Sequence, residues 1–310
     1  MEPVARVQGT DGASLSCSGR VVARYMGGAE LPCDVSPRPY LHPVTTLAGT
    51  QVTGFMPVDH RHHLGASVAI PSINDMNFWG GRTYVRGKGS VSLDNHGVQR
   101  HTRWLRQDPD CLIHELSWDG SDGDPVAREE RSVTARALTT EAWLLSVEFT
   151  LFNTGDCVLT IDSPGARGRA GAGYGGFFWR APADLAWARA FGAGDVHGAA
   201  VHGSRLPWVA LAGSQPEHEP WTLVFAAGHG GAASGGAVAG GAVAGGGAQS
   251  DPWFVRAEDY AGVCSAVAWD RALLVAPHDS VSRWVSVLVA DGVLTPETVE
   301  ATLAAARAEA

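Results

Sequence analysis

Hydrophobic and polar residues alternate with a period of two along much of this chain. Between Trp143 and Leu151 every second residue is apolar, and Ser146, Glu148 and Thr150 lie between them. This alternation predicts a half-buried β-strand, because successive side chains of a strand point to opposite faces. Similar patterns predict strands over 20–25, 100–106, 111–118, 130–139, 157–162, 208–212, 221–227, 253–256, 263–269, 272–276 and 282–290.

Turn-forming residues separate these segments. Residues 119–125 and 153–156 are rich in Asp, Gly, Asn and Pro, which favour tight turns. Many strands with little helical periodicity predict an all-β fold. We therefore expect a large antiparallel β-sandwich that forms a single domain over residues 1–310.

Helical signals are confined to two places. Thr295 suits an N-cap, Pro296 the first helical position and Glu297 the positive end of the helix dipole, and an Ala-rich run follows to Ala310. These residues predict a C-terminal helix. A second, short helix is expected over 182–191.

Residues 228–249 consist almost entirely of Gly and Ala. Such a segment has little side chain to bury and much chain entropy to lose, so we expect a flexible loop between the strands at 221–227 and 253–256. A surface insertion and a catalytic lid are both compatible with this composition.

The charge and the cysteines limit the partners and the compartment. The net charge is −9 and no basic run occurs, which argues against nucleic acid and anionic membranes as partners. The five cysteines are odd in number and form no C-x-x-C pair, as is typical of reduced thiols. With no signal-peptide-like start and no apolar run of eighteen residues, we expect a soluble, cytoplasmic protein.

The segment Asp59-His60-Arg61-His62-His63-Leu64-Gly65 carries the strongest chemical signal. With His42 in the preceding Pro39–Pro43, it holds four of the twelve histidines. Histidine titrates near neutrality and is the commonest metal ligand. In an extended segment His60 and His62 would share one face, and His63 would lie on the other.

Three interpretations of this cluster stay open. In the first, His60 and His62 transfer protons and Asp59 orients an imidazole. In the second, His60 and His62 bind zinc or iron, and His42, His101 or His114 supplies a further ligand. The cupin pattern is absent, because no Glu follows the His-x-His pair. In the third, the histidines only satisfy backbone groups of a tight loop.

Two later segments predict substrate-binding residues. Gly171–Arg180 combines glycines with Tyr174 and a terminal arginine that could clamp a carboxylate, phosphate or enolate oxygen. In Trp253–Arg256, alternation puts Phe254 and Arg256 on the same face. A β-bulge with a core strand, and a structural pair between Arg256 and Glu115 or Glu148, are the structural alternatives. The residues expected to bind substrate are His42, His63, Trp79, Tyr174, Arg180 and Arg256.

Five of these motifs resemble an uncharacterised bacterial family commonly labelled methane oxygenase (PmoA)-like. They are Pro39–Pro43, Asp59–Gly65, Phe78–Gly80, Gly173–Arg180 and Trp253–Arg256, so the resemblance spans roughly residues 20–292. Many members have Pro at the position of Arg61. The resemblance implies a role in sugar catabolism beside Gfo/Idh/MocA-type oxidoreductases. The strand content is also similar to the galactose-mutarotase-type supersandwich.

The expected function is a carbohydrate-active enzyme that uses histidine acid–base chemistry on a sugar or keto-sugar, as an epimerase, hydrolase or lyase. One alternative is a metal-dependent oxygenase or hydrolase that uses the same histidines, with a divalent metal as cofactor. The other is a non-catalytic sugar-binding module.

Overall fold

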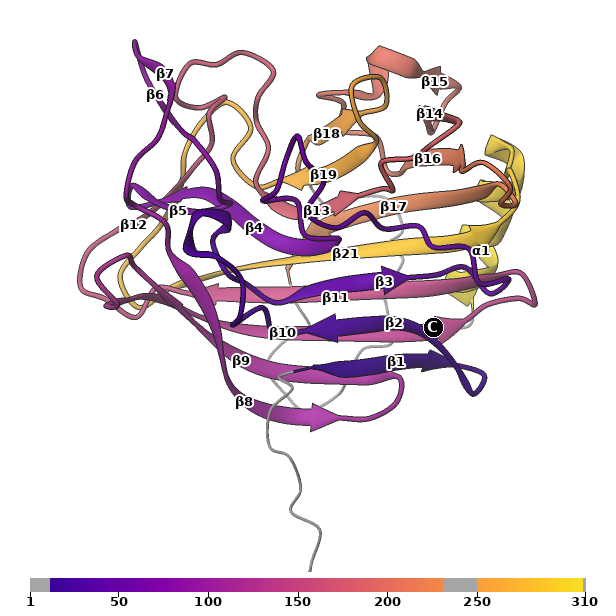
Figure 1. The fold of residues 1–310 in the computed structure, drawn as a ribbon, viewed down its shortest axis with the longest axis horizontal. Coiled ribbons are helices and arrows are strands. Elements are labelled where there is room, and N and C mark those ends of the chain that lie inside the picture. Colours follow the sequence, from indigo (N-terminus) through magenta and orange to yellow (C-terminus); the bar gives the residue numbers. More distant parts are fainter. Residues whose placement is uncertain (1–11, 231–249, 309–310) are drawn as a thin grey trace, which may run out of the picture.

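Two large antiparallel sheets form the body of the molecule. The computed structural model describes residues 12–230 and 250–308 (Figure 1). Over these residues the first sheet has ten strands, and seven follow the order β1 (Ala13–Cys17), β2 (Arg20–Met26), β3 (Tyr40–Val44), β4 (Ala66–Ile73), β13 (Gly176–Arg180), β19 (Gly262–Ala266) and β18 (Trp253–Arg256). At its side, β5 (Met76–Phe78) and β12 (Leu159–Asp162) pair with β4, and β20 (Leu273–Val275) pairs with β12.

The second sheet has nine strands over the same described residues. Their order is β15 (Val196–His197), β14 (Trp187–Gly192), β16 (Val209–Ser214), β17 (Trp221–His229), β21 (Ser280–Asp291), β11 (Ala142–Phe152), β10 (Pro125–Ala137), β9 (Cys111–Asp119) and β8 (Val98–Gln107). Three smaller elements lie in the connections between these strands. They are the two-stranded ribbon of β6 (Thr83–Val85) and β7 (Gly89–Val91) and the 3-10 turns Cys33–Val35 and Gly198–Val201. The antiparallel all-β sandwich is confirmed, and every predicted strand segment overlaps an observed strand.

The main core lies between the two sheets. In β11, Trp143, Leu145, Val147, Phe149 and Leu151 all face this core, as the alternation predicted. The intervening Leu144 faces the opposite side of the nine-stranded sheet. Figure 1 shows β1, β2 and β3 in front of the long strands of this second sheet.

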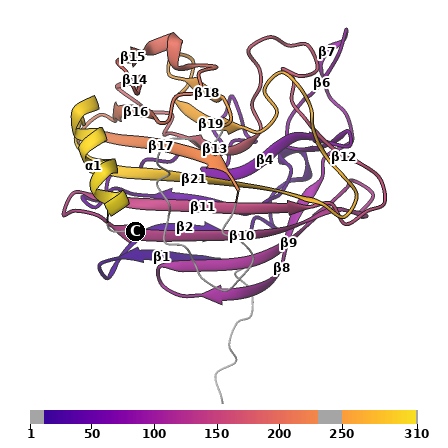
Figure 2. The same cartoon turned by 180° about the vertical axis from the view of Figure 1, so that it is seen from behind.

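The C-terminal helix α1 (Pro296–Ala308) covers the outer face of the nine-stranded sheet, as Figure 2 shows from behind. Its Val299, Leu303 and Ala306 are buried there. The backbone N–H of Thr298 donates to Thr295 Oγ1 at 3.3 Å, which confirms the predicted N-cap.

Two other expectations have different outcomes. The short helix over 182–191 is wrong, because Trp187–Gly192 forms strand β14 and pairs with β16 along its whole length. Tertiary pairing here overrides the helical propensity of an Ala-rich run. In the predicted loop, residues 228–229 end strand β17, and residues 231–249 lie outside the described part of the chain.

No helix within residues 12–230 and 250–308 is long and apolar enough to cross a membrane. All five cysteines carry free thiols.

Candidate functional site

The histidine loop consists of two consecutive turns rather than an extended strand. The N–H of His60 donates to the Pro57 carbonyl at 3.0 Å, and the N–H of His63 donates to the His60 carbonyl at 2.9 Å. The expectation that His63 points away from His60 is therefore wrong, because a turn brings residues i and i+3 together. The His60 and His63 rings stack at 4.6 Å, and His62 meets His63 edge-on at 4.8 Å.

A buried arginine that the sequence analysis missed holds this loop in place. Arg38 lies between two prolines and is 1% exposed. Its Nη2 donates to the His62 carbonyl at 2.7 Å, and its Nη1 donates to the Trp79 carbonyl at 3.1 Å. Gly65 ends the loop with φ +53°, and a Cβ there would lie 2.2 Å from the Leu41 carbonyl oxygen. Only glycine fits this close approach.

The Phe78–Gly81 segment makes room for His62. A Cβ on Gly81 would lie 2.8 Å from His62 Nδ1, so the ring packs directly on this backbone. His96 Nε2 lies 2.8 Å from the Gly81 carbonyl oxygen, which brings this fourth histidine beside His62. The four histidines that gather here are therefore His60, His62, His63 and His96.

Burial keeps two of these rings neutral. Desolvation, followed by the positive charge of Arg38 and the neighbouring histidines, lowers the pKa of His62 to about 3. Desolvation and the same kind of neighbours lower the pKa of His63 well below its usual value. Both imidazoles can therefore donate and accept hydrogen bonds at neutral pH without carrying charge.

His60 is the partly exposed member of the cluster. Its Nδ1 lies 2.7 Å from Asp59 Oδ2, and the two side chains are 37% and 55% exposed. Burial opposes ionisation of Asp59, but the hydrogen bond and charge of His60 outweigh it and lower the pKa of the carboxyl. A carboxylate can only accept, so Nδ1 donates to it, and in the neutral form of the ring Nε2 is then the acceptor.

Arg180, at the end of β13, closes the cluster from the sheet side. The guanidinium lies over the Tyr260 ring at 4.4 Å from its centroid. Arg180 Nη1 is 3.4 Å from His63 Nδ1, and Nη2 is 3.9 Å from Asp59 Oδ1. The structure thus brings the predicted residues Asp59, His60 and Arg180 into one site, together with Tyr260, which the sequence analysis did not single out.

An aromatic layer lies beneath the site on the outer face of the ten-stranded sheet. We call its buried rings, Trp79, Phe178 and Phe254, the aromatic floor. The half-buried rings of Tyr174, Tyr260 and Trp269 pack against it. Strand alternation explains this layer, because Phe177 and Trp179 of β13 face the main core while Phe178 faces outward.

Arg256 lies at the far side of the aromatic floor. Its guanidinium covers the Phe254 ring at 4.3 Å, and its Nη1 is 3.1 Å from His202 Nδ1. Phe254 and Arg256 share a face, as predicted. Arg180 and Arg256 both favour ionisation of Tyr260, but burial dominates and raises the pKa of this phenol to about 12. No sequence motif singled out His202.

Three predicted histidines lie elsewhere. His42 stacks on Phe55, and its Nδ1 lies 3.0 Å from Thr53 Oγ1. His101 and His114 lie on strands β8 and β9, with their Nδ1 atoms 3.0 Å apart, and His114 bonds to Tyr25 between the sheets. These contacts are with residues outside the His60 cluster.

The metal interpretation has no matching geometry in the described ranges. Within residues 12–230 and 250–308, no three His, Cys, Asp or Glu side chains are arranged to hold a metal ion. The rings of His60, His62 and His63 contact one another as stacked and edge-on planes.

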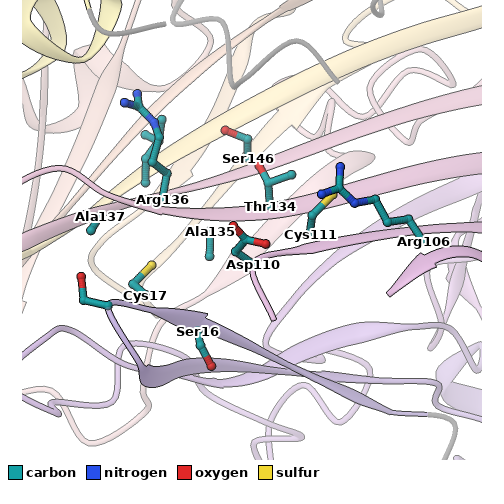
Figure 3. A pocket seen from close by; sticks show the side chains of 12 residues that line it. Ser16, Cys17, Arg106, Asp110, Cys111, Thr134, Ala135, Arg136, Ala137 and Ser146 are labelled. Atoms are coloured by element: carbon teal, nitrogen blue, oxygen red, sulfur yellow. The ribbon is translucent and has the colours of Figure 1, made fainter. Parts of the chain in front are cut away.

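Two hollows differ in their relation to the site. One, of about 260 Å³, opens beside the cluster and is lined by Arg180, Pro182, Leu185, Trp187 and residues 257–261; we call it the Arg180 hollow. The other, of about 330 Å³, lies between β1, β9 and β10 and contains none of the predicted site residues (Figure 3). Burial raises the pKa of its Cys17 thiol to about 11, which disfavours the reactive thiolate.

Comparison with known proteins identifies a family but no activity. Comparison with curated proteins gave no match. The methane oxygenase-like resemblance stays a prediction, since the description of the matching family names no reaction. A family model described as "Family of unknown function (DUF6807)" matches residues 12–304, so this chain belongs to that family.

Proposed function

We propose that this protein is a carbohydrate-active enzyme in which His60 transfers a proton to or from a sugar or keto-sugar. The observation that carries the proposal is the partly exposed Asp59–His60 pair, with 2.7 Å between the carboxylate and Nδ1, beside the buried Arg180. Such a pair fixes the tautomer and leaves Nε2 to exchange a proton with a bound molecule.

The other two histidines of the loop have a supporting role in this proposal. His62 and His63 stay neutral at physiological pH because both are buried among positive neighbours. They position His60 through ring contacts at 5.7 and 4.6 Å and offer hydrogen bonds to the ligand. Proton transfer is therefore assigned to His60 alone, and His62 becomes a positioning residue.

The surroundings support a sugar as the ligand class. The half-buried rings of Tyr174, Tyr260 and Trp269 present apolar faces next to polar groups. A sugar is complementary to this surface, because it has an apolar C–H face and polar hydroxyl groups. Arg180 and Arg256 supply donors for substrate oxygens on either side of Tyr260. Epimerisation, hydrolysis and elimination all require a proton transfer of the kind that the Asp59–His60 pair can perform.

The test is turnover of a panel of aldoses, keto-sugars and sugar acids, followed by proton NMR in deuterated buffer. On any substrate that the parent converts, His60→Gln should lower the rate by about 10²–10⁴-fold, the usual contribution of general acid–base catalysis. The protein should stay folded, because the side chain is partly exposed.

A second Asp–His pair provides the matched control. His197 Nε2 lies 2.8 Å from Asp195 Oδ1 at the β14–β15 hairpin, and the two side chains are 57% and 90% exposed. His197→Gln should leave the rate unchanged. An equal loss in both variants, or near-parental activity of His60→Gln, would end the proposal. Binding of sugars with no turnover by the parent would indicate a sugar-binding module.

A further inference from the structure

Arg180 is a buried cation whose hydrogen-bonding capacity is almost unused. The residue is 2% exposed, and its Nε has no hydrogen-bond partner among the described residues. Nη1 has one long contact at 3.4 Å to His63, and the nearest carboxylate oxygen, on Asp59, is 3.9 Å from Nη2. Asp59 is committed to His60 through its other oxygen at 2.7 Å. A buried guanidinium is costly without partners, so an incoming oxyanion would supply hydrogen bonds that this one lacks.

The Arg180 hollow offers three kinds of surface around this cation. Pro182, Leu185 and Trp187 contribute the smaller, apolar part of a mostly polar lining, and Tyr260 lies against the guanidinium. Glu258 and Asp259 belong to the same lining and are exposed. The volume of about 260 Å³ lies just below the usual range of about 300–1,000 Å³ for ligand sites, so the ligand would be compact.

From this arrangement we infer that Arg180 binds the carboxylate of the substrate, and that the substrate class is a sugar acid. The fork of a guanidinium matches the two oxygens of a carboxylate. The rim carboxylates of Glu258 and Asp259 accept hydrogen bonds from hydroxyl groups and repel a more highly charged head group. In a monoanionic, polyhydroxylated molecule the carboxylate would contact the guanidinium, the hydroxyl groups would contact the rim and the carbon atoms would contact the apolar residues. A phosphate dianion would meet stronger repulsion at the rim.

This inference specifies the substrate class of the proposed enzyme and rests on the proposed function for what the site does with its ligand. Binding experiments test the inference separately. The experiment is calorimetric titration of the full chain with D-gluconate, D-glucuronate, the neutral polyol D-glucitol and inorganic phosphate, at constant ionic strength. We expect at least one of the two sugar acids to bind at least tenfold more tightly than glucitol and phosphate. Equal affinity for glucitol would show that the carboxylate is not recognised, and tighter binding of phosphate would overturn the choice of carboxylate.

Variants then assign the effect to Arg180. Arg180→Met should weaken binding of the preferred sugar acid by tenfold or more, and Arg180→Lys should restore part of it by returning the charge without the fork. Arg189 is the matched control, because it is an exposed arginine on β14, 5.7 Å from the ring of Trp187 in the hollow. Arg189→Met should change affinity by less than twofold. Full retention of affinity in Arg180→Met, or an equal loss in Arg189→Met, would overturn the assignment.

Thermal protection of the unmodified protein provides a readout that needs no variant. The preferred sugar acid should raise the melting temperature more than glucitol at equal concentration, and equal shifts would contradict the inference. The two proposals fail separately. Binding of a sugar acid without any turnover ends the proposed enzyme and keeps the carboxylate site. Turnover of a neutral sugar with no preference for acids keeps the enzyme and ends the carboxylate site.

Discussion

Two buried arginines with opposite surroundings distinguish a structural region of this molecule from the region of the candidate site. Between the sheets, Arg131 donates to both oxygens of Glu129 at 2.6 and 2.8 Å and to Gln99 at 2.9 Å. On the outer face, Arg180 has no comparable hydrogen-bond partner within residues 12–230 and 250–308. The pKa of Arg131 is raised because the attraction of Glu129 outweighs desolvation, whereas desolvation lowers the pKa of Arg180.

The two regions differ in which groups provide hydrogen-bond partners for the buried arginine. The network of Arg131 also includes Tyr25, His114 and Trp118, and its hydrogen bonds join strand β2 of one sheet to β8, β9 and β10 of the other. It is complete within the protein, as expected of a buried polar group that stabilises a specific packing. Arg180, in contrast, has one buried nitrogen, Nε, without a hydrogen-bond partner among the described residues. Histidines occur in both regions, so their presence alone does not distinguish a site from a core.

The largest expected effect comes from breaking the complete network. Arg131→Met leaves Glu129 buried without its partner and should lower the free energy of unfolding by about 3–5 kcal/mol. Urea denaturation followed by tryptophan fluorescence measures this. A change below about 1 kcal/mol would mean that the network is not structural, and the comparison with Arg180 would fail.

Arg38 is intermediate between Arg131 and Arg180, because its guanidinium is hydrogen-bonded only to neutral groups. The carbonyls of Val35, Ser36, His62 and Trp79 and the Ser67 hydroxyl all accept from it. Burial lowers the pKa of Arg38 to about 9. Arg38→Met orphans these acceptors and should destabilise the protein by about 1–3 kcal/mol. It should also lower turnover, since the His62 loop loses its anchor. Unchanged turnover would show that the loop does not depend on Arg38.

Lowering the pH should decrease the free energy of unfolding through the buried histidines of both regions. Desolvation, followed by the charge of Arg131 and then of His101, lowers the pKa of His114 to about 2, so it is neutral when folded and takes up a proton below about pH 6.5 when unfolded. Its contribution is therefore present above pH 6.5 and decreases as the pH falls toward 2, by up to about 1.4 kcal/mol per pH unit. Unfolding curves between pH 6.5 and 5.5 should have a smaller slope in His114→Gln than in the parent. The exposed His278→Gln should keep the parental slope, and a loss of slope there would contradict the assignment.

The smallest effect on folding is expected at Arg180. Arg180→Met replaces an almost unpartnered buried charge by an apolar side chain of similar length, so the free energy of unfolding should change by less than about 1 kcal/mol. The measurement is the same urea titration as for Arg131→Met. A loss as large as that of Arg131→Met would make Arg180 structural and remove the contrast between the two regions.

Local pattern was sufficient for most of the strands and for the C-terminal helix. β11 shows the reason, since its Leu145 and Val147 face the core while Glu148 is only partly buried. The motif at 59–65 likewise located the loop of the candidate site, because the density of histidines there is a property of composition. The sequence analysis missed β4 because its alternation is weak. Its Ala66, Val68 and Ile70 face the main core, but Ala69 on the other face is apolar as well, and Ser67 is the only polar residue between Ala66 and Ile70.

The membership of the site was decided by tertiary contacts. His42 is near His60 in sequence yet stacks on Phe55, while Arg180 and Tyr260 arrive from distant strands and loops. Turn geometry, with its i to i+3 contacts, reversed the predicted direction of His63, since alternation holds only for extended backbone. Whether a buried arginine has partners depends on groups that pairing of remote strands brings within hydrogen-bond distance. The presence of such partners distinguishes Arg131 from Arg180, and the sequence pattern alone cannot predict it.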